Sequence, residues 1–544
     1  MSKEIRNSVF LISEGTSNPS SGIVDVTDLG IVSSDVLDQT DAIRVILEAD
    51  YKIVRFPAGI YRCRNLYLQD DQRIIVNGTI KNINGITFDV TQNAAEGQKN
   101  IYIEDATTDQ LNSLESLINE APDYYYYVAF WDDDYTIEGG GTGQVHHNSW
   151  VSRLTAINKV SKYITVKDNI PAMPNYCGGI LKVSANAKVT VLYNVLEVSA
   201  KEDVTILGYG TLDANRANTA DVNPVWISGE EGYPDYAGSG ANFIECINSR
   251  QGKTLTVKDI TVQNGKDNIM TWYYDGMVWL KNVKSKNAHN KNIAFIVNSE
   301  EDNPDIQGMW EDCDADGSDY EDGFIGYTSA DNLTIRNCIA RNCPRYGFAW
   351  NRWTSLNNYA ENLEAYNCGN SFSCNRGGIT DILTLRNLYY EGGGYHDKVP
   401  NYQSGMELRS QIATIGGYEN IYNLGFITDK QTYGILIMFN RDINLIWEAT
   451  APAKNKLCVG NLTPPHAFGY WLRITADCIN IVIDGGGVLE VNNFKYLFWI
   501  ETGSTGIVIK NCRFNDYTNL GPIDGSATFE NNYFNDTLYE TGHP

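Results

Sequence analysis

A short phrase that recurs through residues 255–392 constrains the fold more than any other feature of this sequence. Each copy is an alternating apolar strand followed by Asn or Asp, with a second polar residue five positions later, as in LTIRNCIARN. Steps of 23, 30, 25, 25 and 25 residues separate the marker residues, which are Asp259, Asn282, Asp312, Asn337, Asn362 and Asn387. A period of this length built from strands, without helix-length apolar patterns, predicts a β-solenoid.

Parallel pairing of neighbouring coils would stack equivalent side chains in columns about 4.8 Å apart. We expect the marker asparagines to form a ladder in a turn, because the Asn side chain binds backbone groups and tolerates left-handed geometry. Cys313 and Cys338 are 25 residues apart, as are Cys343 and Cys368, so each pair is expected to share a column of buried thiols. The 11 cysteines have neither CxxC pairs nor zinc-ligand spacing, which argues against a disulfide framework and a zinc site.

The charge and hydropathy of the chain exclude several classes of partner. A formal net charge of −25 argues against nucleic acid, because binding phosphates requires a basic surface. No apolar run approaches the length that spans a membrane, so no membrane insertion is expected. The apolar run at residues 9–12 is too short for the core of a signal peptide, which predicts synthesis without Sec export.

A helical pattern covers residues 38–49, and the strand–turn–strand segment KIVRFPAGIYRC follows it directly. Later the chain contains VSAKEDVTILGYGTLDANRAN. These segments resemble the capping helix and coils of pectate-lyase-like right-handed β-helices, a pattern that also opens the polysaccharide-degrading tailspikes of tailed phages. The resemblance covers the helix, the first coils and the chain from about Leu196 onward.

The predicted fold class is all-β: a right-handed single-stranded parallel β-helix with an N-terminal capping helix and a small β-rich insertion. The expected organisation is an N-terminal segment with the capping helix at 1–50, first coils at 51–92, the insertion at 93–195 and the main β-helix at 196–544. The last residues, a partner subunit or a further domain must cover the final coil, because an open end exposes backbone groups to edge pairing.

A second strand in each coil is marked by recurring units such as Asp267-Asn268-Ile269 and Asp322-Gly323-Phe324. If Phe324 points inward, alternation sends Asp322 outward, and the face so defined is predicted to be an exposed glycan groove. Aromatic rings and Arg forks suit sugar chains. The candidate substrate-binding residues are Trp272, Tyr273, Tyr327, Arg345, Arg352, Trp353 and Arg409.

Glycoside hydrolysis requires two carboxyl groups, one protonated and one ionised. The candidate catalytic residues are Asp322, Asp267, Asp319, Glu321 and Glu407. Asp267 and Asp322 occupy equivalent places two coils apart, a separation of about 2 × 4.8 Å, near the roughly 6.5–9.5 Å of inverting enzymes. The adjacent Asp319 and Glu321 are expected to raise at least one pKa in the cluster, which suits a general acid.

Calcium is an alternative role for part of this cluster. Asp312, Asp314 and Asp316 copy the opening of a calcium loop, but Gly323 stands where such a loop requires a bidentate Glu. The His146–His147 pair has no third ligand at motif spacing. We therefore assign no metal and no cofactor.

The resemblance implies a phage tailspike-like depolymerase that binds and cleaves a bacterial surface polysaccharide, such as capsule, exopolysaccharide or O-antigen. It also implies a homotrimer in a virion tail, made in the host cytoplasm beside other tail proteins and acting outside the cell. Two alternatives stay open: a polysaccharide lyase acting by β-elimination, and a non-catalytic β-helix that binds a glycan receptor or has a structural role.

Overall fold

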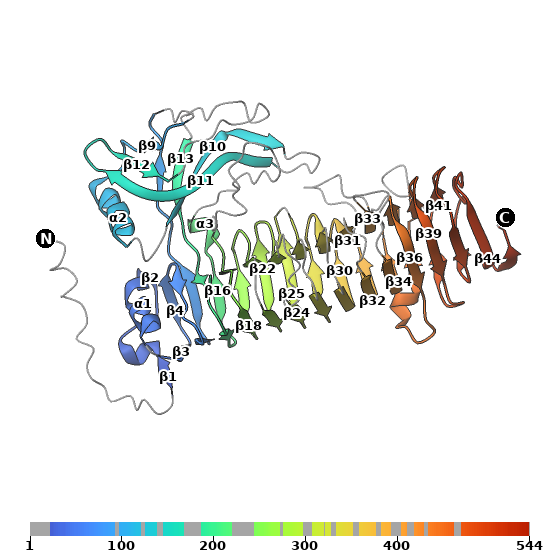
Figure 1. Ribbon diagram of the computed structural model, residues 1–544, viewed down its shortest axis with the longest axis horizontal. Coiled ribbons are helices and arrows are strands. Elements are labelled where there is room, and N and C mark those ends of the chain that lie inside the picture. The colour runs from blue at the N-terminus through green and yellow to red at the C-terminus, as the bar shows by residue number, and fades with distance from the viewer. Residues whose placement is uncertain are drawn as a thin grey trace.

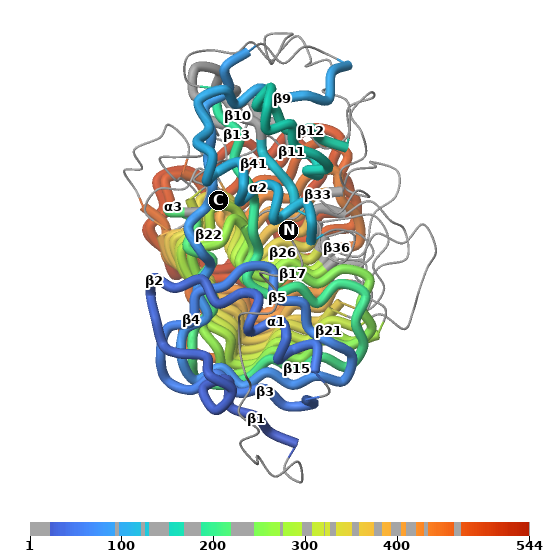
Figure 2. Tube along the Cα trace, turned by 90° about the vertical axis from the view of Figure 1, so that its left-hand side faces the viewer, coloured from blue at the N-terminus to red at the C-terminus, as the bar shows by residue number. Residues whose placement is uncertain are grey.

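The computed structural model describes residues 22–49, 51–92, 97–120, 126–138, 145–167, 187–219, 244–272, 276–296, 307–319, 321–327, 333–351, 358–376, 382–392, 404–410, 418–428, 433–461 and 469–542. These residues form a long solenoid of stacked coils, with a small separate sheet beside its N-terminal part (Figure 1). Figure 2 looks along the solenoid from the N-terminal end and shows the coils superposed.

One wall of the solenoid is a 12-stranded sheet in which each strand pairs in parallel with the strand of the next coil. Its strands are β5 (Leu66–Tyr67), β14 (Leu196–Glu197), β17 (Ile247–Arg250), β20 (Ile269–Trp272), β23 (Ile293–Ile296), β26 (Phe324–Tyr327), β29 (Tyr346–Asn351), β31 (Asn370–Arg376), β33 (Ser404–Ser410), β35 (Tyr433–Met438), β38 (Tyr470–Ile474) and β41 (Tyr496–Ile500). We call this sheet the second-strand wall.

The other strands of the coils belong to a 27-stranded sheet that bends at a corner into two columns. The first column contains β1 (Ile23–Asp25), β3 (Ile53–Phe56), β6 (Arg73–Val76), β15 (Val204–Leu207), β18 (Thr254–Lys258), β21 (Met277–Lys281), β24 (Gln307–Glu311), β27 (Leu333–Arg336), β36 (Arg441–Ile446), β39 (Ile479–Asp484) and β42 (Ile507–Lys510). The second contains β2 (Ser34–Asp38), β4 (Ile60–Cys63), β7 (Thr79–Asn82), β16 (Thr211–Asp213), β19 (Thr261–Gln263), β22 (Lys284–Ala288), β25 (Asp314–Ser318), β28 (Ile339–Arg341), β37 (Leu457–Val459), β40 (Glu490–Asn492) and β43 (Arg513–Asn515). Four longer strands run through the corner: β30 (Asn358–Tyr366), β32 (Ile382–Glu391), β34 (Tyr418–Ile427) and β44 (Ala527–Phe534). The predicted all-β parallel β-helix is confirmed.

The marker residues lie at the corner between these columns, and all six have left-handed backbone geometry, with φ between 50 and 57°. The Asn362 amide donates to Asn337 (3.0 Å) and accepts from Asn387 (3.0 Å), while Asn337 donates to Asp312 (3.1 Å). The predicted ladder is therefore confirmed. A second ladder, in which Asn342 accepts from Asn367 (3.0 Å), runs five residues further along each coil.

The solenoid interior is filled by equivalent apolar residues of successive coils. Phe324 stacks on Phe348 with ring centroids 4.8 Å apart, and Phe348 stacks on Phe372 at 5.5 Å. Register places Cys313 opposite Cys338, as expected. All ten cysteines among the described residues are buried and unbridged.

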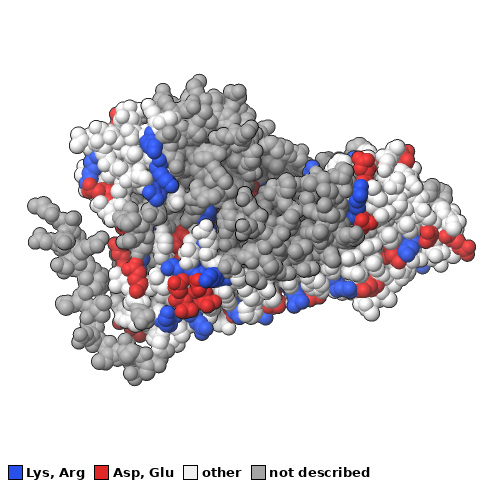
Figure 3. Space-filling view, in the orientation of Figure 1, with Lys and Arg blue, Asp and Glu red and all other residues white. Residues whose placement is uncertain are grey.

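The same stacking organises the charged outer surface. Lys281, Glu311, Arg336 and Glu361 follow one another in register, so that unlike charges meet in adjacent coils. Arg336 Nε lies 3.1 Å from Glu361 Oε1, and Lys281 Nζ lies 3.6 Å from Glu311 Oε2. Figure 3 shows basic and acidic side chains interleaved along the lower edge of the solenoid.

The expected capping helix is α1 (Thr40–Glu48), which packs Ile43, Ile46 and Leu47 against the first coil. Asp38 Oδ1 accepts the Thr40 backbone N–H (3.0 Å) and satisfies one of the free donors at the helix start. This helix is confirmed.

The insertion is an antiparallel sheet with a helix against it. Its strands are β8 (Thr87–Asp89), β9 (Asn100–Tyr102), β10 (Tyr127–Glu138), β11 (Val145–Asn158), β12 (Tyr163–Val166) and β13 (Ala187–Leu192). The helix α2 (Thr108–Asn119) begins with a capping box formed by Thr107 and Gln110, a signal that the sequence analysis did not use. Because β8 pairs with β13, the insertion begins before residue 93, within the segment expected to form first coils.

A buried ionic network joins the insertion to the first coil. Glu120, directly after α2, accepts from Arg44 Nη1 of α1 (2.7 Å) and from Arg64 Nη2 (3.2 Å). Arg44 Nη2 also donates to the Tyr126 hydroxyl (3.0 Å). Since both guanidinium groups are nearly inaccessible, these bonds are stronger than exposed ones.

At the far end, β45 (Thr537–Thr541) turns back and pairs antiparallel with β44. The last residues of this chain thus cover the edge of the final coil. Among the described residues, no helix is long and apolar enough to cross a membrane.

We expect Asn362→Ala to lower the free energy of unfolding by about 2 kcal/mol, because it removes two ladder hydrogen bonds worth about 1 kcal/mol each. Denaturant-induced unfolding measures this loss. Asn362→Gly is the control, since it removes the same bonds but tolerates the left-handed backbone better than Ala. A stability of Asn362→Ala within about 0.5 kcal/mol of the parent chain would contradict the structural role of the ladder.

Candidate active site

The candidate site lies in the turn that enters the second-strand wall, in four successive coils. Ile269, Ile293, Phe324 and Phe348 are register partners on β20, β23, β26 and β29. The residues two positions before them therefore form a column, in the order Asp267, Lys291, Asp322 and Tyr346. Backbone bonds hold the column: Asn268 N–H donates to Lys291 O (3.0 Å) and Asn292 N–H to Asp322 O (3.0 Å).

Two cations link three carboxylates in this turn. Lys291 Nζ lies 2.5 Å from Glu321 Oε2 and 3.9 Å from Asp267 Oδ1, and the Lys291 backbone N–H donates to Asp267 Oδ1 (2.9 Å). Arg345 places Nη1 3.3 Å from Glu321 Oε1 and Nε 3.1 Å from Asp322 Oδ1. We call these five residues the Asp322 cluster.

The two adjacent acids of the cluster have opposite pKa shifts. Burial raises the pKa of Asp322 to about 7 with help from the Glu321 charge, and Arg345 only partly opposes it. Burial alone would also raise the pKa of Glu321, but Lys291 and Arg345 outweigh it and lower that pKa to about 2. The cluster therefore holds a protonatable carboxyl beside a firmly ionised one, which is the pair required for acid–base chemistry.

A second group of side chains adjoins the cluster. Asp319 Oδ2 accepts from Arg216 Nη2 (2.9 Å) of the short helix α3 (Arg216–Thr219) and lies 3.1 Å from His289 Nδ1. The Asp319 side chain is 41% exposed, while those of Glu321, Lys291 and Arg345 are 13–16% exposed. Solvent therefore reaches the cluster at Glu321, Lys291 and Arg345, and the more exposed Asp319 lies beside it.

Two further buried acids extend the site toward the N-terminus, and the sequence analysis missed both. Glu245 precedes Ile247 of β17 by two residues and so continues the Asp267 column. Burial raises its pKa well above the usual range, and Asp267 and Glu197 add to the shift. Burial also raises the pKa of Glu197, against hydrogen bonds from Asn194 (2.5 Å) and Asn248 (2.7 Å). The sequence signal was present, because Glu245-Cys246-Ile247 repeats the spacing of Asp267-Asn268-Ile269.

The prediction that the face carrying Asp322 is an exposed groove is wrong. Phe324 and Phe348 point into the core. Asp322 and Tyr346 precede them by two residues, and a period of two does not send such residues to the opposite side. Asp322 is 0% exposed, Asp267 2% and Tyr346 8%. Ile325 and Ala349, on the outward side of β26 and β29, are buried as well. Asp322 lies in the turn before β26, where alternation does not set the direction of the side chain, and even on the outward side of the strands other residues cover the surface.

The structure places the other catalytic candidate, Glu407, away from the cluster. It lies on β33, three coils beyond Ile325 of β26, and accepts a hydrogen bond from Asn370 Nδ2 (2.6 Å). Burial raises its pKa, while Arg409 and Asn370 act in the opposite direction. Glu407 therefore does not pair directly with Asp322.

Of the predicted substrate-binding residues, Arg345 belongs to the cluster and Arg409 is an exposed residue near Glu407. Trp272 and Tyr327 end strands β20 and β26, and their side chains lie outside the described part of the structure. Tyr273, Arg352 and Trp353 lie outside the described residues altogether.

The three residues considered for calcium each bind a side chain of the next coil. Asp312 accepts from Asn337, Asp314 pairs with Arg341, and Asp316 accepts from Asn342 (2.9 Å). Asp314 and Asp316 stand on strand β25. Over the described residues, no group of three or more His, Cys, Asp or Glu side chains is arranged to hold a metal ion.

No protein-family model and no curated protein sequence matches this chain. Solved structures with a similar overall course include tailspike protein 3 of bacteriophage CBA120 (10% identity, TM-score 0.40, covering 94% of this chain and 62% of that one). Another is a family 28 exopolygalacturonase of Yersinia enterocolitica, with 12% identity and a TM-score of 0.37, covering 93% of this chain and 78% of that one. A third is the A-module of the Azotobacter vinelandii mannuronan C-5 epimerase AlgE4, with 12% identity and a TM-score of 0.37, covering 92% of this chain and 96% of that one. The parallel pairing of successive coils, and not these similarities, establishes the β-helix fold of this chain. At this identity no residue role is transferred from these proteins.

The raised pKa of Asp322 makes the stability of the fold depend on pH. An unfolded Asp has a pKa near 3.9, so between about pH 4 and 7 the folded chain holds the extra proton and loses stability as pH rises. We expect the stability of Asp322→Asn, relative to the parent chain, to increase from pH 5 to pH 8 in denaturant titrations.

Asp484→Asn is the control for this measurement, because Asp484 has a lowered pKa and stays ionised over the whole range. The pKa of Glu321 is lowered and not raised, so its titration changes the stability of the fold in the opposite direction, and only below about pH 5. A pH-independent difference between Asp322→Asn and the parent chain would show that Asp322 does not titrate there.

Proposed function

We propose that this chain is a glycan depolymerase resembling phage tailspikes, which cleaves a bacterial surface polysaccharide by glycoside hydrolysis. The observation that carries the proposal is the Asp322 cluster, where a carboxyl with a pKa near 7 lies beside a carboxylate with a pKa near 2. Glycosidases require such a difference in protonation between two acids. The parallel β-helix supplies a long wall along which a polymer can contact several coils.

In this mechanism Asp322 is the general acid. It donates its proton to the glycosidic oxygen as the bond from that oxygen to the anomeric carbon breaks. A water molecule adds its oxygen to the anomeric carbon and transfers its proton to Glu321, which Lys291 and Arg345 keep ionised. Asp267, two coils from Asp322 at about 10 Å along the wall, is the second candidate for the base.

Access to Asp322 requires a movement of Arg345. Asp322 has no exposed surface and contacts Arg345 Nε, whereas the guanidinium group is partly accessible. An anionic or hydroxyl-rich glycan that binds the guanidinium offers it alternative acceptors. Displacement of Arg345 then brings the glycosidic oxygen to the Asp322 carboxyl.

The proposed setting is a virion tail. We infer a homotrimer that is made in the host cytoplasm, joins other tail proteins and acts on bacterial polysaccharide outside the cell. The acidic net charge of −25 fits a partner other than nucleic acid.

A lyase is the second candidate, and one observation favours it. Lys266 is buried beside Asp267, and burial lowers the pKa of its amine. An amine with a lowered pKa can remove the proton beside a uronate carboxylate, while Lys291 and Arg345 neutralise the developing charge. Products of elimination absorb in the ultraviolet, which distinguishes them from products of hydrolysis.

We expect Asp322→Asn to lower the rate of depolymerisation by about 10²- to 10⁴-fold, the usual contribution of a general acid. The fall in polymer size of capsule and O-antigen preparations measures the rate, and thermal unfolding verifies the fold. Asp484→Asn, a carboxylate change on the outer surface, is expected to leave the rate unchanged.

Three outcomes would contradict this proposal. Full activity of Asp322→Asn removes the assigned acid. Ultraviolet-absorbing products favour the lyase. Binding of a glycan by the parent chain without any fall in polymer size favours a non-catalytic receptor-binding or structural β-helix.

A further inference from the structure

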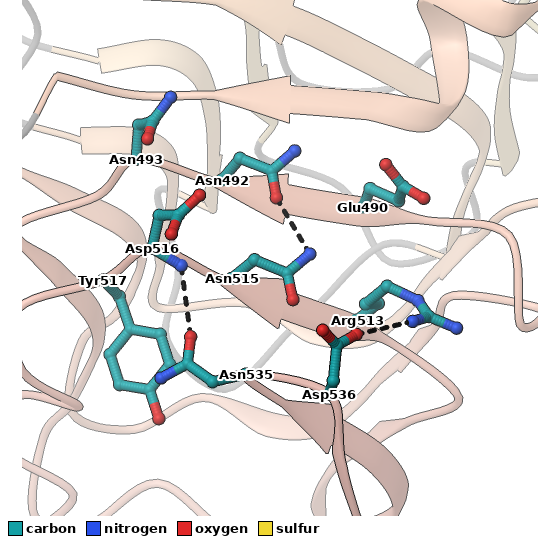
Figure 4. Close-up of a pocket in the computed structure, with 9 residues that line it drawn as sticks. All are labelled: Glu490, Asn492, Asn493, Arg513, Asn515, Asp516, Tyr517, Asn535 and Asp536. Atoms are coloured by element: carbon teal, nitrogen blue, oxygen red, sulfur yellow. Dashed lines mark hydrogen bonds and ion pairs between the residues drawn. The ribbon is translucent and has the colours of Figure 1, made fainter.

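A polar hollow of about 790 Å³ lies beside the last three coils. Figure 4 shows around it side chains from β40, β43 and the turns that follow β40, β43 and β44. They are Glu490, Asn492, Asn493, Arg513, Asn515, Asp516, Tyr517, Asn535 and Asp536. The volume is in the range of small-ligand sites, and we call it the C-terminal hollow.

The hollow lies on the same column of strands that leads into the Asp322 cluster. Register partners run from Asp316 of β25 through Arg341, Tyr366, Glu391, Ile427 and Val459 to Asn492 of β40. Six coil steps separate the two ends, which is about 29 Å at 4.8 Å per coil. A polymer lying along the solenoid axis past the cluster therefore also passes the hollow.

The side chains of the hollow are held by neighbours in adjacent coils. Asn515 Nδ2 donates to Asn492 Oδ1 (3.1 Å), and Arg513 Nη1 donates to Asp536 Oδ1 (3.0 Å). Tyr517 packs edge-on against Phe534, with ring centroids 6.3 Å apart. A site with its side chains already ordered loses less conformational entropy on binding.

The chemistry of this lining fits sugars and selects among them. Amides offer both donors and acceptors to vicinal hydroxyl groups, and the Tyr517 ring offers an apolar face to sugar carbons. Glu490, Asp516 and Asp536 outnumber Arg513, so the hollow carries excess negative charge. Negative charge disfavours uronate and other acidic units, and admits neutral and amino sugars.

We propose that the C-terminal hollow is a second glycan-binding site, for neutral or amino sugar units, on the column of strands that leads into the Asp322 cluster. It holds a distant part of the polymer while another part is cleaved. The role of the hollow during cleavage rests on the proposed function, whereas glycan binding at the hollow does not. Two sites on one chain raise the apparent affinity for a polymer above that of either site.

The test uses the whole chain carrying Asp322→Asn, so that the polymer stays intact. Surface plasmon resonance measures its binding to immobilised capsules and O-antigens of known composition, some with neutral or amino sugars and some built only of uronates. Adding Asn492→Ala and Asn515→Ala is expected to weaken binding to the first group by about tenfold, or about 1.4 kcal/mol.

The matched control is the pair Asn420→Ala and Asn444→Ala. Asn444 Nδ2 donates to Asn420 Oδ1 over the same 3.1 Å, and both residues are half-buried, but they lie on β34 and β36 in the other column of strands. This pair is expected to leave the affinity unchanged, and equal thermal unfolding of both double variants excludes a general loss of the fold.

Three results would each overturn the inference. The Asn492/Asn515 double variant could bind with unchanged affinity, or the control pair could lose as much affinity. The chain could also bind no glycan that contains neutral or amino sugars. Cleavage by the parent chain separates the two proposals. Depolymerisation without dependence of binding on Asn492 and Asn515 overturns only the second site. Binding that depends on these residues, with no fall in polymer size, overturns only the hydrolase.

Discussion

Register between successive coils is the constraint on which this structure depends. A parallel sheet that slipped by one residue would send every core side chain to the other face. The ladders prevent this slip, because Asn337, Asn362 and Asn387 each bind the equivalent residue of a neighbouring coil from a left-handed corner. Asn suits the position because it tolerates that backbone geometry and carries both a donor and an acceptor.

Fixed register also determines which charges meet. Residues at equivalent positions lie only about 4.8 Å apart, so a buried column of like charges would be strongly destabilising. The column through Asp267 and Asp322 has Lys291 between its two acids, and Glu321 is shared by Lys291 and Arg345. The cluster is thus a network of ion pairs that spans four coils. Removal of one charged residue changes the electrostatic potential, and hence the titration, at the others.

Features that repeat from coil to coil could be predicted from the sequence, whereas contacts that depend on how distant segments pack could not. The Asn ladder, the inward Phe324 and Phe348, and the two-coil spacing of the acids follow from period and alternation. Lys291 and Glu245 occupy equivalent places in that column and were not predicted, although Glu245 precedes Ile247 by the same two residues that separate Asp267 from Ile269. The contact of Arg216 with Asp319 joins residues 103 positions apart through α3, and no local pattern indicates it.

The burial of Asp322, which the sequence analysis got wrong, is what makes an acid role physically reasonable. An exposed Asp in an open groove would keep a pKa near 3.9 and would hold almost no proton at neutral pH. Removal from water raises that pKa to about 7, despite the adjacent Arg345, and so keeps a transferable proton. The burial that raises the pKa of Asp322 also shields its carboxyl from solvent and from a ligand. In the proposed hydrolase, a ligand must move Arg345 to reach this proton, so recognition of the glycan is a condition for its cleavage.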